Sequence, residues 1–177
     1  MKTRICVSLC SWMVALSAIA QPSASAENPV FTMTSVALYQ PNDVLVERLG
    51  DASGLASYAK ALVAAASDEF SKWPSRAPVQ GTLVVAVKPN GGVRVWLVVP
   101  KGSIPDAWSM ALKRKLEAVT PIVAVREGPT AFAINFSAWR AALASPQPPP
   151  IPDEWRTAME GRPPGVIPDS ALAVIWP

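Results

Sequence analysis

The stretch that decides the fold is GTLVVAVKPNGGVRVWLVV, residues 81–99. Both arms are rich in valine, which favours β-strands. The proline, asparagine and glycines at 89–92 tolerate the backbone angles of a tight turn. The spacing therefore predicts a β-hairpin. In its second arm, Arg94 and Trp96 alternate with apolar residues, so one side of that strand is wholly apolar and should face helices.

A helix is predicted on either side of this hairpin. Over residues 53–73, apolar side chains recur at steps of three and four, as one buried helix face requires. Pro74 ends this pattern. A second apolar stripe covers 105–119, where Asp106 suits the positive amino end of a helix. Pro121 stops it.

A third strand is predicted over residues 131–136, because Phe132, Ile134 and Phe136 alternate with small or polar residues. The core thus runs helix, strand, strand, helix, strand. The predicted fold class is α+β, with a three-stranded antiparallel sheet packed by two helices.

Residues 1–26 have the three parts of a secretory signal. A basic start precedes an uncharged run, Ile5 to Ala20, and small residues at Ala24 and Ala26 provide a cleavage site. The apolar run has 16 residues, fewer than the roughly 20 that a membrane-spanning helix needs. Export to the periplasm of a Gram-negative bacterium is therefore expected, with no membrane span after cleavage. An uncleaved signal anchored in the inner membrane is the alternative.

The rest of the chain divides into three parts. Residues 27–52 are a lead-in in which 30–38 could form an extended segment, although its alternation is imperfect. Residues 53–144 form the α+β domain. Residues 145–177 are a proline-rich tail, with a short helix and a terminal apolar strand over 171–176. One hypothesis is that this end docks on the chain's own sheet and protects an edge. The alternative is a disordered or loosely packed tail.

The composition excludes several kinds of site. The chain has no histidine, and Cys6 and Cys10 both lie in the signal. Triads that use histidine and zinc sites made of imidazole and thiolate are therefore excluded in the mature chain. No cofactor is predicted, and the chain is not expected to be an enzyme. The adjacent acidic pairs, Asp68-Glu69 and Asp153-Glu154, are interpreted as solvated surface because neighbours on a helix point in different directions.

The charge balance argues against nucleic acid as a partner. The whole chain carries 16 basic and 13 acidic side chains. Removal of the signal takes Lys2 and Arg4 with it, which leaves 14 against 13, a net charge of +1. The basic run at 113–115 lies near the end of a predicted helix, where its charges favour the helix dipole. No basic face of the kind that grips nucleic acid is expected.

The order of these motifs resembles the carboxy-terminal periplasmic domain of the TonB/TolA family over residues 54–137. Tyr58 opens a Tyr-Ala-x-x-Leu-Val pattern, and Gly81 opens a valine-rich strand that ends in Lys-Pro-Asn-Gly-Gly-Val. The helix containing Leu112 leads to Pro121. The stretch Ala-Phe-Ala-Ile-Asn-Phe at 131–136 is similar to the closing strand of the family.

The resemblance implies that a partner segment pairs with the edge of the sheet by strand addition. The partner is expected to be an outer-membrane or secretion-system protein. The residues of this chain that match the pairing strand are Ala131, Phe132, Ala133, Ile134, Asn135 and Phe136.

The chain also departs from the family. Energy-transducing members keep a membrane helix with a serine and histidine pair and carry a long linker, and this chain has no histidine. Coupling to a proton gradient is therefore not expected. The alternatives are a secreted hydrolase that uses two carboxylates and a structural envelope or secretion-system accessory protein.

Overall fold

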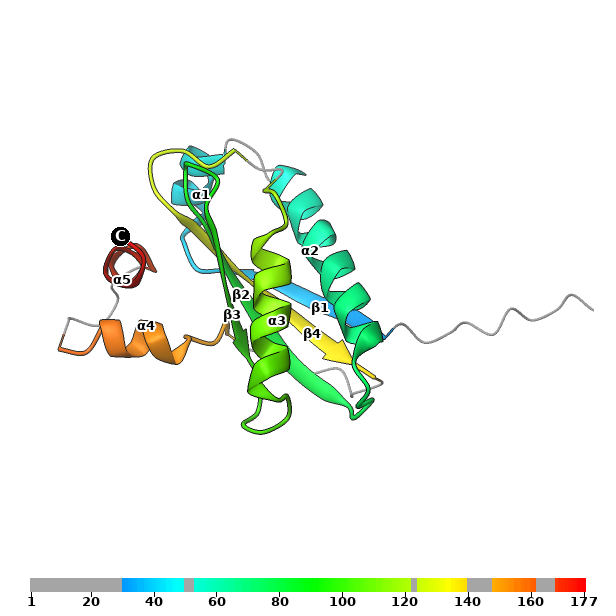
Figure 1. Cartoon of the computed structure of the whole chain (residues 1–177). Helices are drawn as coiled ribbons and strands as arrows, with labels where there is room; N and C mark the ends of the chain where they lie inside the picture. Colours follow the sequence, from blue (N-terminus) through cyan, green and yellow to red (C-terminus); the bar gives the residue numbers. More distant parts are fainter. Residues whose placement is uncertain (1–29, 50–52, 122–123, 140–147, 162–167) are drawn as a thin grey trace, which may run out of the picture.

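The computed structural model describes residues 30–49, 53–121, 124–139, 148–161 and 168–177. They form one antiparallel sheet with helices on both of its faces (Figure 1). The elements, in chain order, are β1 (Phe31–Leu38), α1 (Asn42–Leu49), α2 (Ser53–Lys72), β2 (Val79–Val87), β3 (Val93–Val98), α3 (Asp106–Glu117), β4 (Thr130–Ala138), α4 (Asp153–Ala158) and α5 (Pro168–Ile175). Within these ranges, no helix is long and apolar enough to cross a membrane. The predicted signal at 1–26 lies outside the described residues and stays a prediction.

The predicted hairpin and its two flanking helices are confirmed. In α2, the side chains that recur at helical spacing are buried, with Tyr58, Leu62 and Phe70 fully enclosed. In α3, Leu112 and Leu116 are buried in the same way. The hairpin turn closes through Lys88 N–H donating to the Gly92 carbonyl at 2.9 Å. Gly91 within this turn has φ +78°, which explains the need for glycine there.

The prediction of three strands is wrong, because the sheet has four, in the order β1-β4-β2-β3. The additional strand, β1, lies in the stretch interpreted as a lead-in. Its register against β4 shifts between Met33 and Ser35, as it does at a β-bulge. Met33 pairs with Phe136 before the shift, and Val36 pairs with Ile134 after it. The bulge interrupts the two-residue period, which is why this stretch alternates imperfectly in the sequence.

The predicted terminal strand over 171–176 is also wrong, because these residues belong largely to helix α5. Ala171 and Leu172 are buried, whereas Val174 is exposed, so the segment has one apolar side at helical spacing. The hypothesis that this end docks on the chain's own sheet holds in a different form. It packs as a helix on a face of the sheet, and not as a strand at its edge.

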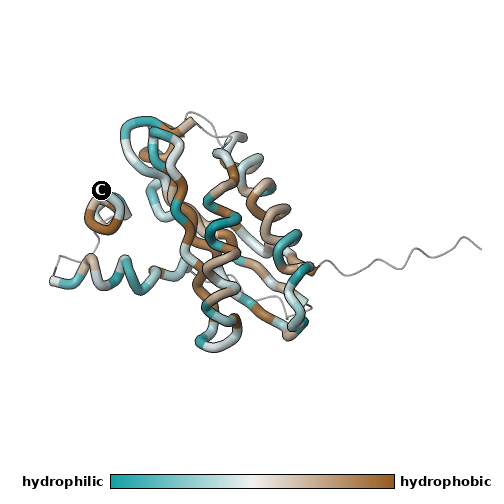
Figure 2. The backbone as a smooth tube through the Cα atoms, viewed as in Figure 1, coloured by the Kyte–Doolittle hydropathy of each residue, from teal (hydrophilic) through white to brown (hydrophobic). Residues whose placement is uncertain are grey.

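The two faces of the sheet have separate cores. We call the face covered by α2 and α3 the first face, and the face covered in part by α4 and α5 the second face (Figure 1). Figure 2 shows hydrophobic residues along the strands and on parts of the helices beside them. The first-face core includes a cluster of aromatic rings in which Phe70 contacts Phe31, Trp108 and Phe136. The second-face core is smaller and centres on Trp96 and Trp155.

Candidate functional site

The residues predicted to pair with a partner lie in β4, which is an interior strand. Ala133 pairs with Ala37 of β1 on one side and with Val84 of β2 on the other. The same holds along the strand, whose buried members are Ala131, Phe132, Ala133, Ile134 and Phe136, with Asn135 partly buried. The placement of the docking edge on β4 is therefore wrong. The physical reason is that β1 already occupies the side of β4 that a partner strand would need.

Strand β1 forms one outer edge of the sheet, and the side of β1 that faces away from β4 is open in the described residues. Val30 accepts a hydrogen bond from Trp139 N–H at 3.0 Å, and Tyr39 N–H donates to the Ala131 carbonyl at 3.3 Å. Because backbone groups alternate in direction along an antiparallel strand, these two bonds fix which residues of β1 face outward. Val36 and Leu38 direct their amide and carbonyl groups away from β4. In the described residues, no strand pairs with this side.

The outward-facing positions of β1 also carry exposed apolar side chains. Met33, Val36 and Leu38 are 37%, 40% and 39% exposed. The whole strand, FTMTSVAL, contains no charge and no proline. Natural edge strands usually have one of these features, because each of them hinders pairing with another chain. We call this combination of free backbone groups and exposed apolar side chains the β1 edge.

The opposite outer strand, β3, is protected. Glu117 of α3 accepts a hydrogen bond from Val95 N–H through its carboxylate Oε1 at 3.0 Å. Since β2 lies on the other side of β3, this carboxylate takes a backbone donor that a partner strand would need. Arg94, on the same strand, pairs with Glu154 at 2.8 Å. A charged strand whose edge amide is already satisfied is a poor template for strand addition.

The chain beyond β1 is fixed by the C-terminal segment, by which we mean the described parts of residues 148–177. Tyr39 Oη donates to the Pro150 carbonyl at 2.5 Å, and burial raises the pKa of the Tyr39 hydroxyl above its ordinary range. Arg48 pairs with Asp169 at 2.6 Å. The hydrogen bond from Arg48 lowers the pKa of the Asp169 carboxyl, with a smaller contribution from Gln40. These contacts hold the end of β1 in place.

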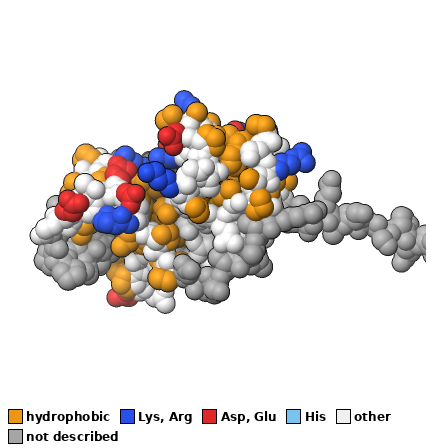
Figure 3. Space-filling model, turned by 90° about the horizontal axis from the view of Figure 1, so that it is seen from below, with side chains coloured by type: hydrophobic (Ala, Val, Ile, Leu, Met, Phe, Trp, Pro, Cys, Tyr) orange, Lys and Arg blue, Asp and Glu red, His pale blue; other side chains and the backbone are white. Residues whose placement is uncertain are grey.

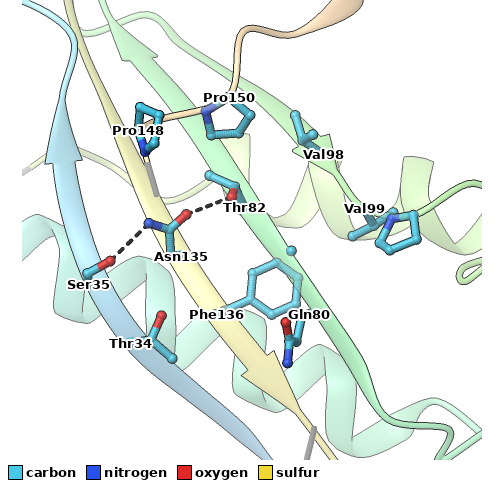
Figure 4. A pocket seen from close by; sticks show the side chains of 12 residues that line it. Thr34, Ser35, Gln80, Thr82, Val98, Val99, Asn135, Phe136, Pro148 and Pro150 are labelled. Carbon is cyan, nitrogen blue, oxygen red and sulfur yellow. Dashed lines mark hydrogen bonds between the residues drawn. The ribbon is translucent and has the colours of Figure 1, made fainter. Parts of the chain in front are cut away.

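A groove lies on the second face beside β1, with a volume of about 420 Å³. Figure 4 shows Asn135 at its centre, donating from Nδ2 to Ser35 Oγ and accepting at Oδ1 from Thr82 Oγ1. These two bonds are 2.9 Å and 2.7 Å long and join three strands across the floor of the groove. Pro148 and Pro150 lie over it. The groove therefore offers neutral hydroxyl and amide groups.

The lining of this groove does not fit the carboxylate-dependent hydrolase. The hydrolase alternative needs two carboxylates that face a cleft, and the lining of this groove includes no Asp or Glu. Among the described residues, no group of three His, Cys, Asp or Glu side chains is placed to hold a metal ion. The face seen in Figure 3 carries acidic and basic side chains next to one another, without a patch of one sign.

Comparison with known proteins does not assign this chain to a family. No protein-family model, curated protein or solved structure matches this chain. The resemblance to the TonB/TolA domain is therefore carried by the sequence motifs alone and stays a prediction.

Proposed function

We propose that this chain is a protein-binding module of the cell envelope that recognises an extended segment of a partner by strand addition along the β1 edge. The observation that carries the proposal is the contrast between the two outer strands. Within the part of the chain that the structure describes, β1 has free backbone groups and three exposed apolar side chains, whereas Glu117 protects β3. The predicted secretory signal and the resemblance to the TonB/TolA domain support an outer-membrane or secretion-system protein as the partner.

The side chains of β1 must contribute much of the binding free energy. A backbone hydrogen bond contributes about 0.5–1.5 kcal/mol net, and association costs roughly 4–15 kcal/mol in lost translational and rotational freedom. The outward groups of Val36 and Leu38 provide only a short ladder. Burial of the exposed apolar area of Met33, Val36 and Leu38 is the second contribution, since apolar area contributes roughly 25 cal/mol per Å².

The same geometry indicates the kind of segment that fits. Met33, Val36 and Leu38 project on the helix side of the sheet, as do the residues of β4 paired with them. Ser35 and Ala37 project on the second face. An added strand continues this alternation. The partner segment is therefore expected to alternate apolar residues, on the helix side, with small or neutral polar residues on the other side.

Site-specific photo-crosslinking in an envelope extract tests the proposal. A photoreactive residue at Val36 is expected to capture one partner, and the same residue at Met110 of α3, which is 57% exposed, is the matched control. The captured band should disappear when Leu38 is also replaced by proline, because proline removes an outward amide. Equal capture from both positions, or a band that Leu38→Pro leaves unchanged, would contradict strand addition at β1.

A further inference from the structure

The second face of the sheet carries an apolar patch made of Val84, Ala86, Trp96 and Ala131. The C-terminal segment covers this patch with three buried side chains, Trp155 of α4 and Ala171 and Leu172 of α5. The ring of Trp155 meets that of Trp96 edge-on, at 5.2 Å between centroids. The patch is thus a binding surface for a short pair of helices. We call it the second-face patch.

Cations at the margin of the second-face patch match acceptors on the C-terminal segment. Arg94 donates to the Ile175 carbonyl at 2.5 Å and pairs with Glu154 at 2.8 Å. The other carboxylate oxygen of Glu154 accepts from the indole N–H of Trp96 at 2.6 Å. One acidic side chain of the segment therefore engages both a charge and an aromatic group of the sheet.

Two further cations hold the amino and carboxyl ends of α5. Arg48 makes a two-bond contact with the Asp169 carboxylate, at 2.9 and 2.6 Å. Lys88 lies 4.5 Å from the centroid of the Trp176 ring, within the range of a cation–π interaction. Cations of the surface thus contact the segment at three separate points, two of which are pairs of opposite charge.

The first-face core is built without the C-terminal segment. The residues of the first-face core lie between Val30 and Trp139 and include none of the C-terminal segment. The intramolecular fit also leaves a defect, because the indole N–H of Trp155 is buried and has no hydrogen-bond partner among the described atoms. An unsatisfied buried donor costs about 1–3 kcal/mol. The attachment of the segment is therefore weaker than its apolar contacts alone would make it.

We propose that the second-face patch also accepts the C-terminal segment of a second copy of this chain, so that two copies exchange segments. The charge matches that hold the segment within one chain, Arg94 with Glu154 and Arg48 with Asp169, act equally between two. Eight residues, 140–147, join the segment to the domain, and a chain of that length spans up to about 30 Å. The exchange uses none of the residues of the β1 edge.

Complementary charge reversal tests the exchange. One full-length variant carries Arg48→Glu and Arg94→Glu, and a second carries Glu154→Arg and Asp169→Arg. Within either variant the segment and its own patch repel each other, but between the two variants both contacts are attractive. Each variant alone is expected to be monomeric by light scattering, and the equimolar mixture is expected to contain a one-to-one dimer with twice the mass. A mixture that stays monomeric would overturn the proposal.

The control combines all four substitutions in one chain. This variant restores attraction both within the chain and between copies, so it should unfold like the wild type and show the same distribution of monomer and dimer as the wild type. The mixing experiment is repeated with two single variants, Arg94→Glu in one chain and Glu154→Arg in the other. These two side chains are 33% and 41% exposed. The mixture yields the same one-to-one dimer if segments exchange, and separate monomers if they do not, even where the substitutions at Arg48 affect folding.

Discussion

The two outer strands of the sheet differ in what happens to their free backbone groups. On β3, a helix carboxylate takes an edge amide, and the charged side chain of Arg94 is held by the C-terminal segment. On β1, the outward groups have no strand beside them within the described residues, and the adjacent side chains are apolar and exposed. When one edge of a sheet is protected and the other is open, another chain can extend the sheet only at the open edge.

The largest expected effect follows from removing the anchor of β1. Phe31 is 4% exposed, and its ring stacks on Phe136 at 4.7 Å. Phe31→Ala should lower the free energy of unfolding by about 3–5 kcal/mol, as is typical for a buried aromatic residue. Urea titration measures this loss. Leu38→Ala, at a side chain that is 39% exposed, is the control. Equal losses would show that β1 is not anchored through Phe31.

The second prediction gives β1 the protection that β3 has. Val36→Lys combined with Leu38→Lys should weaken the captured partner more than about tenfold, or 1.4 kcal/mol, because a charged edge strand resists pairing. The free energy of unfolding should change by less than about 0.5 kcal/mol, as at other surface positions. Titration calorimetry with the partner measures the first effect. Met110→Lys on α3 should leave the affinity unchanged.

The third prediction removes the protection of β3. Glu117→Ala takes the acceptor from Val95 N–H, and the lost bond to a charged group should cost about 1.5–3 kcal/mol. Amide exchange at Val95 should accelerate, and the chain should self-associate at high concentration. Glu117→Gln keeps an acceptor oxygen and serves as the control. If Glu117→Ala exchanges no faster than wild type at Val95, the carboxylate does not protect this edge.

The smallest expected effect is a dependence on pH. The pKa of Asp169 is lowered in the folded chain by its hydrogen bond to Arg48. This contact therefore stabilises the chain above the ordinary pKa of an aspartate, near 4, and the contribution is lost as the pH falls through the lowered value. Asp169→Asn should make unfolding less sensitive to acid in that window. A thermal unfolding series from neutral pH to pH 2 checks this; unchanged acid sensitivity would contradict it.

The sequence predicted the elements whose periodicity is uninterrupted. The helix around Leu62, the hairpin closed at Gly91 and the strand around Ile134 all have a clean helical or strand pattern, and each is present. β1 was missed because its bulge, between Met33 and Ser35, puts residues on one face at unequal spacing. The sequence of β1 is still eight residues without a charge. That feature indicates an extended segment, but it does not show where the segment lies in the sheet.

The candidate site was misplaced for a related reason. Strand order depends on long-range pairing, and a local pattern such as that of Ala131 to Phe136 does not reveal which neighbours a strand has. The short apolar run around Leu172 suits a strand or a buried helix equally by periodicity. In the structure the run is helical. Its residue Asp169 pairs with Arg48 of α1, and Leu172 packs on the second face of the sheet, contacts that the local sequence pattern does not reveal.

Residue-resolved amide hydrogen exchange of the free and partner-bound full chain tests the claim about β1 most directly. In the free chain, the amides of Val36 and Leu38 should exchange faster than that of Ala37, which faces β4. In the complex, Val36 and Leu38 should become protected while Val95 does not change. Protection that leaves Val36 and Leu38 unchanged, or that falls on β3 instead, would contradict strand addition at this edge.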